Sequence, residues 1–265
     1  MPVSKGPFIL LSFFSISLLL LTACNDDIDG NGNGPAPELT LIESFPLAIN
    51  DPSGLVMDKS GDFLWTVSDD PGGHIHKISL TGTVLGVLSA YAGDDMEGIT
   101  MNPNDGTLWI VEERLRKVIQ LTTEGEVLQE FEVFVPNQNI NDGLEGITWN
   151  PHNDHVYVVN EKNPRRFFEF DTTNDFDLIR EVDINFSGEF FMGDLSGLYY
   201  DPIGDEIWFL SDDSKKLVVT DQKLTPLRTY PLFIDKFEGI AGDLANNRIY
   251  LVNDRLNRLY VFAYE

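Results

Sequence analysis

The stretch of sequence that decides the fold is Leu144-Glu145-Gly146-Ile147, because related stretches recur along the chain. The other copies are Pro52-Ser53-Gly54-Leu55, Met96-Glu97-Gly98-Ile99, Leu195-Ser196-Gly197-Leu198 and Phe237-Glu238-Gly239-Ile240. Their glycines are separated by 44, 48, 51 and 42 residues. A repeat of about 40–50 residues is typical of the blades of a β-propeller. The sequence therefore predicts five blades.

Each copy continues in the same way, with a short apolar strand, a turn, a second strand, an acidic loop and two more strands. In the second copy we expect strands over 98–101, 107–111, 117–122 and 126–133. Four antiparallel strands make one propeller blade. A β-sandwich would not explain five copies in register, so we predict an all-β, five-bladed β-propeller.

The two ends of the repeated region are each incomplete. The fifth copy stops at Glu265 after its third strand, whereas Leu39 to Leu47 has the pattern of a fourth strand without a blade. We predict that this N-terminal strand completes the last blade and so closes the ring, which removes an open sheet edge. The propeller domain is expected to span residues 38–265.

The first residues have the features of a secretion signal. Lys5 provides a positive charge, and Phe8 to Leu21 form an apolar run too short for a comfortable membrane span. The next residues, Leu21-Thr22-Ala23-Cys24, resemble the bacterial lipobox, in which cleavage precedes a cysteine that then carries lipid such as palmitate. We expect a signal peptide over 1–23 and a lipid on Cys24; the alternative is an uncleaved anchor.

A polar, acidic, Gly-rich tether is expected over residues 24–37, before the propeller. Lipidation would place the protein in the cell envelope, attached to the plasma membrane or the outer membrane and facing the periplasm or the cell surface. The membrane, reached through the lipid, is therefore its first expected partner. We expect the propeller itself to be a monomer.

Composition excludes several classes of function. The chain has 18 Lys and Arg against 43 Asp and Glu, a net charge of -25, and such a surface repels nucleic acid. The single cysteine excludes an intrachain disulfide and a cysteine-based zinc site, and the four histidines do not form a zinc ligand set.

Acidic residues recur at two positions of the repeat that a propeller brings to the same mouth of its channel. The first position, at the entry to the inner strand, is occupied by Ser53, Glu97, Glu145, Ser196 and Glu238. The second, 16 residues later in every copy, is occupied by Asp69, Glu113, Glu161, Asp212 and Asp254.

Carboxylates that converge in this way repel one another unless a cation lies between them. Oxygen-only ligands favour a hard ion, so we expect calcium, with magnesium second. Glu97, Glu145 and Glu238 are the predicted direct ligands, and the second set is predicted to be partly ligands and partly rim. The alternative is that a Glu or Ser before the glycine only satisfies backbone donors of the neighbouring blade.

Basic residues follow the second acidic position in several copies. Two interpretations stay open: a rim that binds an anionic ligand, or ion pairs with the neighbouring acids. The residues considered for the rim are Arg114, Lys162, Arg165 and Arg255.

The repeats resemble those of the SdiA-regulated family of bacterial envelope proteins, distant relatives of NHL-repeat propellers. The resemblance rests on Ser-Gly at 53 and 196, on Glu-Gly at 97, 145 and 238, on Asn160-Glu161-Lys162-Asn163-Pro164 and on Val252-Asn253-Asp254-Arg255. It implies a five-bladed propeller with a calcium site and no established activity. The chain departs from the family pattern at Asp254, where Glu is usual.

Two functions follow as hypotheses. The first is a non-catalytic, calcium-binding propeller that receives a small ligand, a peptide or a glycan at its channel mouth. The second is a calcium-dependent hydrolase of the esterase or lactonase type, in which Asp69 or Glu113 would act as base. The second has less support, because the mouth carries no histidine and fold alone does not give function.

Overall fold

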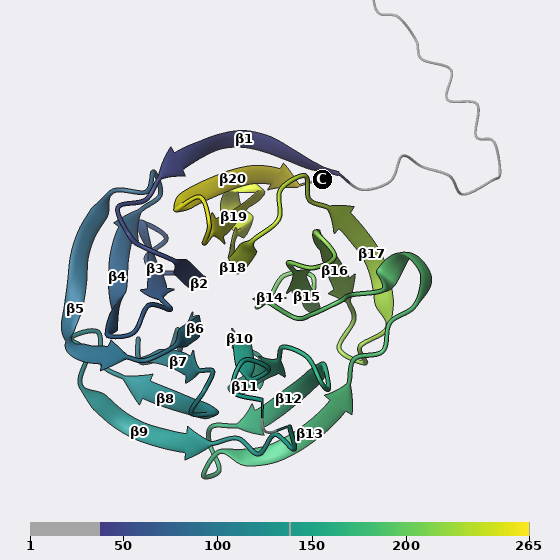
Figure 1. The fold of residues 1–265 in the computed structure, drawn as a ribbon, viewed down its shortest axis with the longest axis horizontal. Coiled ribbons are helices and arrows are strands. Elements are labelled where there is room, and N and C mark those ends of the chain that lie inside the picture. The colour runs from purple at the N-terminus through teal and green to yellow at the C-terminus, as the bar shows by residue number, and fades with distance from the viewer. Residues whose placement is uncertain (1–37, 138, 265) are drawn as a thin grey trace, which may run out of the picture. The chain divides into compact units, whose positions relative to one another are not determined.

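A computed structural model describes residues 38–137 and 139–264 and has five four-stranded antiparallel sheets arranged around a central axis (Figure 1). Blade 1 contains β2 (Pro52–Met57), β3 (Phe63–Ser68), β4 (Gly73–Ser79) and β5 (Val84–Gly93). Blade 2 contains β6 (Met96–Met101), β7 (Leu108–Glu112), β8 (Lys117–Leu121) and β9 (Val127–Glu132). Blade 3 contains β10 (Leu144–Asn150), β11 (His155–Asn160), β12 (Arg166–Asp171) and β13 (Asp177–Asp183).

The remaining strands complete the ring. Blade 4 contains β14 (Gly197–Asp201), β15 (Glu206–Ser211), β16 (Lys216–Thr220) and β17 (Pro226–Pro231). Blade 5 contains β18 (Phe237–Asp243), β19 (Arg248–Asn253), β20 (Arg258–Tyr264) and β1 (Leu39–Pro46). Two short 3-10 turns lie at Gly188–Phe190 and Leu244–Asn246. The predicted all-β, five-bladed propeller is confirmed.

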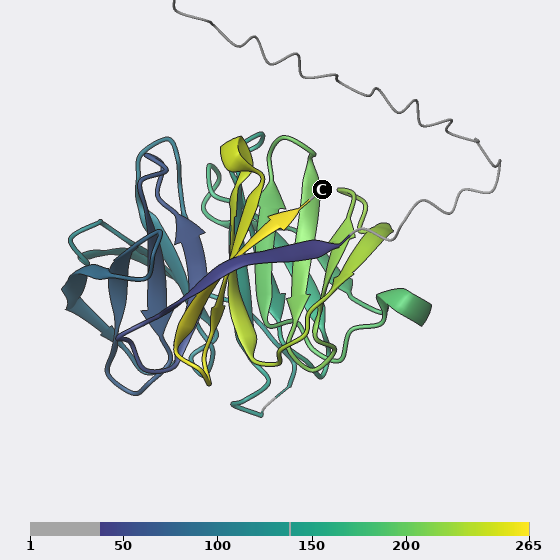
Figure 2. The ribbon, with the colours of Figure 1, turned by 90° about the horizontal axis from the view of Figure 1, so that it is seen from above.

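The ring closes in the way that we predicted from the two incomplete ends of the repeated region. Strand β1 pairs antiparallel with β20, from Leu39 opposite Tyr264 to Pro46 opposite Arg258. Figures 1 and 2 show β1, in purple, beside the yellow β20. The Arg258 guanidinium also donates to the carbonyl of Ser44 at 3.0 Å. The first and last strands of the propeller therefore hold one sheet together.

The hydrophobic core is divided among the gaps between neighbouring blades, with one cluster in each gap. Between blades 2 and 3, Phe176 stacks on Phe131 with ring centroids 4.2 Å apart and on Trp109 at 5.9 Å. All of these clusters come from residues of the propeller itself. The segment 38–265 therefore carries its own core and its own closing strand, and we expect it to fold alone.

At the axis, the glycine of each repeat lies against the backbone of the next inner strand. A Cβ atom on Gly98 would lie 2.2 Å from the carbonyl oxygen of Glu145, and one on Gly197 would lie 2.5 Å from that of Glu238. Gly54, Gly146 and Gly239 make equivalent approaches to the neighbouring strand. Only glycine allows five inner strands to come this close.

The outer strand of each blade has a bulge at which one residue lacks a partner in the adjacent strand, and β5 has a second register shift between Leu88 and Gly93. The five unpaired residues are all aliphatic and about half exposed: Ile42, Leu85, Leu128, Ile179 and Leu227. Such bulges bend and twist a strand. Each exposed sheet edge of the propeller is therefore interrupted.

The predicted signal peptide, the tether and Cys24 lie outside the described residues. Within the described ranges, no helix is both long enough and apolar enough to cross a membrane.

Replacement of the axial glycine of blade 2 tests the close packing at the axis. In the segment 38–265, Gly98→Ala is expected to lower the free energy of unfolding by about 3 kcal/mol, because the new methyl group meets the Glu145 backbone. Urea denaturation measures the change. Gly86→Ala is the matched control, since the nearest atom to its Cβ would be 4.0 Å away, and it should change stability by less than about 0.5 kcal/mol. Equal effects of the two substitutions would contradict the inference.

Candidate functional site

The three glutamates predicted as metal ligands lie at irregularities in the inner strands. In β6 the pairing with β7 passes from Met96 to Gly98 and skips Glu97. In β18 it skips Glu238 in the same way, and in β10 the shift includes Glu145. A bulge re-aims the side chain of the extra residue. The backbone thus turns these carboxylates out of the regular alternation of the strand.

Two groups of carboxylates form where blades 2 and 3 meet. Oxygen atoms of Asp95, Glu97 and Glu113 lie within 4.8 Å of one another, and so do those of Glu113, Glu145 and Glu161. Glu113 belongs to both groups. We call these five residues the acidic mouth. Four of the predicted ligands are therefore brought together here, with Asp95 as an additional member.

Glu145 is, with Glu97, one of the two least compensated members of the acidic mouth, since no ion pair with a described residue involves either carboxylate. Glu145 is only 8% exposed, and within the described part of the chain its carboxylate accepts no hydrogen bond. Glu113 differs, because its Oε1 accepts the backbone N–H of Gly143 at 3.0 Å. Burial of a carboxylate that accepts no hydrogen bond costs free energy. A cation bound beside Glu145 would offset this cost.

Three of the other four predicted ligands surround a lysine instead. The Nζ of Lys236 lies 3.2 Å from a carboxylate oxygen of Glu238, 3.2 Å from one of Asp212 and 4.0 Å from one of Asp254. Burial lowers the pKa of Lys236, but the carboxylates of Glu238 and Asp212 outweigh this effect and raise it. In blade 5 the protein supplies its own cation.

Lys236 stands three residues before the glycine of its repeat. The same position is occupied by Asp95 in blade 2 and by Gly143 in blade 3. It is also Asp in blades 1 and 4, and this recurrence was the available signal for Asp95 as a further acid of the site. Blades 2 and 3 thus lack the lysine that neutralises the carboxylates of blade 5.

Two smaller acidic groups lie elsewhere on the ring. Asp69 groups with Asp51 and Asp70, and Asp212 with Asp194 and Asp213. Asp194 is already satisfied, because it accepts the hydroxyl of Ser211 and the backbone N–H of Asp213. These groups are not part of the acidic mouth.

The two serines at the first position have a structural role. The Ser53 hydroxyl donates to the carbonyl of Glu97 at 2.8 Å, and that of Ser196 donates to the carbonyl of Phe237 at 3.1 Å. Both bonds join neighbouring blades. At these two positions the residue does satisfy the backbone of the next blade, although the group satisfied is a carbonyl acceptor and not the expected N–H donor.

The basic residues considered for an anion-binding rim are mostly engaged. Arg114 Nε forms an ion pair with Asp95 Oδ2 at 3.0 Å, although the two atoms are not aligned for a hydrogen bond. Lys162 donates a hydrogen bond to the carboxylate of Glu161 at 2.5 Å. Arg255 pairs with Asp235. Arg165 instead donates to the carbonyl oxygens of Gly193 at 3.1 Å and Ile184 at 3.4 Å. These contacts fit the ion-pair interpretation for Arg114, Lys162 and Arg255.

Burial is the main cause of the raised pKa values of the acids at the channel mouth. It raises the pKa of Glu97 and Glu145 well above the ordinary value, and their neighbours Glu238 and Glu97, respectively, raise it further. Burial and the carboxylate of Asp51 raise the pKa of Asp69 to about 7. Burial and a hydrogen bond with Asp95 raise that of Glu113 to about 8. At neutral pH without a cation, Glu113 is therefore mostly protonated.

The channel behind the acidic mouth is closed. Between the axial glycines and the apolar residues that follow them, the remaining space is about 10 Å³, which is room for about one water molecule. A ligand at the acidic mouth is therefore confined to that face.

These features define a closed five-bladed β-propeller with a buried carboxylate site at one end of its channel. The chain belongs to the SdiA-regulated family, whose family model matches residues 41–263. The sequence resemblance to this family is thereby confirmed. No curated protein matches the chain.

Several solved structures share the propeller fold. Glutaminyl cyclase of Myxococcus xanthus is 12% identical, with a TM-score of 0.69 over 87% of this chain and 97% of that one. A nidogen/laminin complex is 13% identical, with a TM-score of 0.58 over 79% of this chain and 74% of that one. Virginiamycin B lyase of Staphylococcus aureus is 18% identical, with a TM-score of 0.50 over 80% of this chain and 66% of that one. At these identities the likeness shows the fold alone.

The raised pKa values predict how stability depends on pH when no divalent cation is present. A carboxyl whose pKa is raised by folding stabilises the folded state at low pH, and this stability is lost as pH rises through the folded pKa. With values of about 7 for Asp69 and about 8 for Glu113, the melting temperature in EDTA is expected to fall by roughly 5 °C between pH 5 and pH 9. Thermal denaturation of 38–265 measures the fall, and Glu113→Gln should make it shallower. A melting temperature that rises over this range would contradict the prediction.

Proposed function

We propose that the protein is an envelope lipoprotein whose propeller binds calcium at the acidic mouth and, beside the ion, a ligand or partner. The observation that carries the proposal is the position of Glu113, which is shared by two buried carboxylate groups at the junction of blades 2 and 3. One ion at this junction would contact ligands from both blades.

The charge balance of the acidic mouth supports a divalent ion. Among the described residues, only Arg114 and Lys162 form ion pairs with its five carboxylates. Within the described ranges, Glu97, Glu113 and Glu145 form no ion pair with a lysine or arginine. The negative charge that these carboxyl groups carry once a cation displaces their protons favours a multiply charged cation over a water molecule.

The type of ligand supports calcium. The two groups contain only carboxylates, and hard cations such as Ca²⁺ bind oxygen ligands from carboxylates and backbone carbonyls. Magnesium is the second choice because it requires a stricter octahedral geometry. The proposed ligand set is narrower than the sequence pattern alone suggested, since Lys236 occupies the place of an ion beside Glu238, Asp212 and Asp254.

The partner that we propose beside the ion is a small ligand, a peptide or a glycan. The site lies at the end of the channel, and the closed axis behind it limits the ligand to the open face. The proposed function is binding without catalysis, because no histidine belongs to the carboxylate groups of the acidic mouth.

One observation favours a second candidate, a calcium-dependent hydrolase of the esterase or lactonase type. Asp69 has a pKa of about 7, which suits a general base at neutral pH. Hydrolysis of model esters and lactones in the presence of calcium, lost in Asp69→Asn, would favour this candidate over binding alone.

Calcium titration by calorimetry tests the proposed site. The segment 38–265 is expected to bind calcium saturably, and Glu113→Gln or Glu145→Gln should each weaken binding by about tenfold or more, since each removes a charged ligand. Glu238→Gln is the matched control, because Glu238 already faces Lys236, and it should retain most of the affinity. No binding, or equal losses in all three variants, would overturn the proposed site.

Lipidation is proposed from the lipobox and tested separately. Expressed as the full chain in a bacterial host, the protein is expected in the membrane fraction and labelled by radioactive palmitate. Cys24→Ala should remove the label and release the protein into the soluble envelope fraction, because Cys24 is the sole cysteine. A full-length, labelled Cys24→Ala protein would contradict the proposal.

A further inference from the structure

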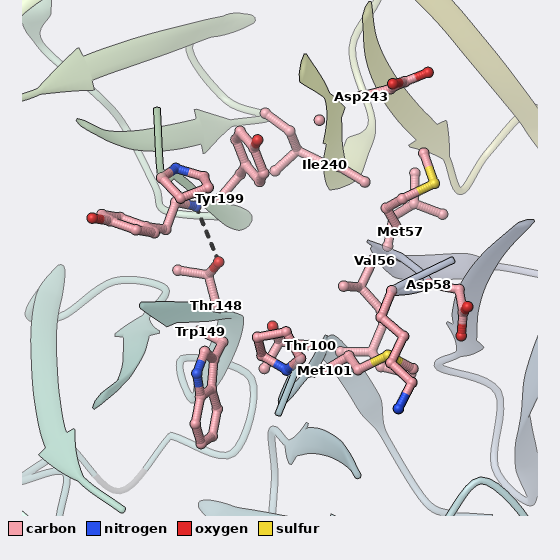
Figure 3. Close-up of a pocket in the computed structure, with 18 of the residues that line it drawn as sticks. Val56, Met57, Asp58, Thr100, Met101, Thr148, Trp149, Tyr199, Ile240 and Asp243 are labelled. Atoms are coloured by element: carbon pink, nitrogen blue, oxygen red, sulfur yellow. Dashed lines mark hydrogen bonds between the residues drawn. The ribbon is translucent and has the colours of Figure 1, made fainter. Parts of the chain in front are cut away.

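A second cavity lies at the other end of the channel. Each inner strand begins at the acidic mouth and ends at this cavity, which has a volume of about 400 Å³ (Figure 3). Its residues have no part in the acidic mouth. We propose that this cavity, which we call the distal pocket, binds a small, neutral, largely apolar molecule.

The walls of the distal pocket come from the second residue after each axial glycine. Val56, Thr100, Thr148 and Tyr199 occupy this position in blades 1 to 4 and line the cavity, as Figure 3 shows. Its inner end is formed by the apolar residues next to the glycines, such as Ile240. The walls are therefore mainly hydrocarbon, as in most small-molecule sites.

Two hydroxyl groups interrupt the apolar wall. The Thr148 hydroxyl accepts the backbone N–H of Tyr200 at 3.0 Å, which leaves its own proton free to donate. Thr100 forms no side-chain hydrogen bond with any described residue, and its hydroxyl faces the cavity (Figure 3). Thr100 and Thr148 lie on neighbouring blades. A ligand with one hydrogen-bonding group on an otherwise apolar body would use both.

Charged residues line only the opening of the distal pocket. Asp58 accepts the indole N–H of Trp65 at 3.3 Å, and Asp243 accepts an amide N–H of Asn246 at 2.9 Å, so both already have partners. Lys59, the third charged lining residue, is exposed. Among the described lining residues, the inner part of the pocket has no charged side chain, so an ion there would lose its hydration without a counter-charge. The chemistry therefore selects a neutral molecule.

The distal pocket is already formed by the fold. Its walls belong to inner strands, which hydrogen bonds hold in the blades, and the pocket volume lies within the range of about 300–1,000 Å³ found for ligand sites. Because the closed axis separates it from the acidic mouth, binding at one end does not require an occupant at the other.

The test uses N-phenyl-1-naphthylamine, a neutral aromatic amine whose fluorescence rises in apolar surroundings. Titrated into 38–265, it is expected to bind saturably at one site. Val56→Trp should weaken binding about tenfold or more by filling the cavity. Thr100→Val, which keeps the side-chain shape, should weaken it about three- to tenfold through the lost hydroxyl.

Two controls make the outcome decisive. Glu145→Gln, at the opposite end of the channel, and addition of calcium should leave probe binding unchanged, and the melting temperature of each variant reports its folding. Leu85→Trp adds an equally large side chain on the outside of blade 1 and should have no effect on affinity. The proposal is overturned if the probe does not saturate, or if both pocket variants bind it as the unaltered protein does.

Discussion

The contact on which the rest of the structure depends is the approach of each axial glycine to the backbone of the next inner strand. Five blades are few for a ring, so their inner strands meet with no space for a side chain at this level. The channel is thereby divided into two separate ends. The same crowding places carboxylates of neighbouring blades within a few ångströms of one another. The chemistry of the molecule is set by how closely its blades pack.

Equal positions in the repeat do not have equal roles. Three residues before the axial glycine, the chain has Asp95 in blade 2, Gly143 in blade 3 and Lys236 in blade 5. Lys236 neutralises one side of the ring, whereas the smallest possible residue at Gly143 allows Glu113 to lie against the backbone of blade 3. A nearly symmetric scaffold thus carries an asymmetric charge distribution. This asymmetry concentrates uncompensated carboxylates at the junction of blades 2 and 3.

Much of the fold could be predicted from the repeat, because its period fixes the number of blades and the unmatched strands at the two ends fix the closure. The constant spacing also found four of the five carboxylates of the acidic mouth, the three carboxylates that surround Lys236, and Asp69, which groups with Asp51 and Asp70. It did not distinguish Glu145 from Glu238, because that difference depends on contacts across a gap between blades. The sequence pattern did not reveal Lys236, because this lysine precedes the first acidic position of its repeat. The basic residues that the pattern did reveal follow the second acidic position. The distal pocket depends on the size of residues such as Thr100 and Val56, which no motif marks.

The outer bulges have a consequence for the attachment to a membrane surface that we propose. Molecules confined to two dimensions meet one another side by side far more often than molecules free in solution, and a propeller presents the edge of a blade in every direction. An unbroken outer strand would offer each neighbour a row of free backbone groups to extend the sheet. The extra residues at Ile42, Leu85, Leu128, Ile179 and Leu227 break that row in all five blades. Dense crowding is therefore compatible with each molecule remaining separate.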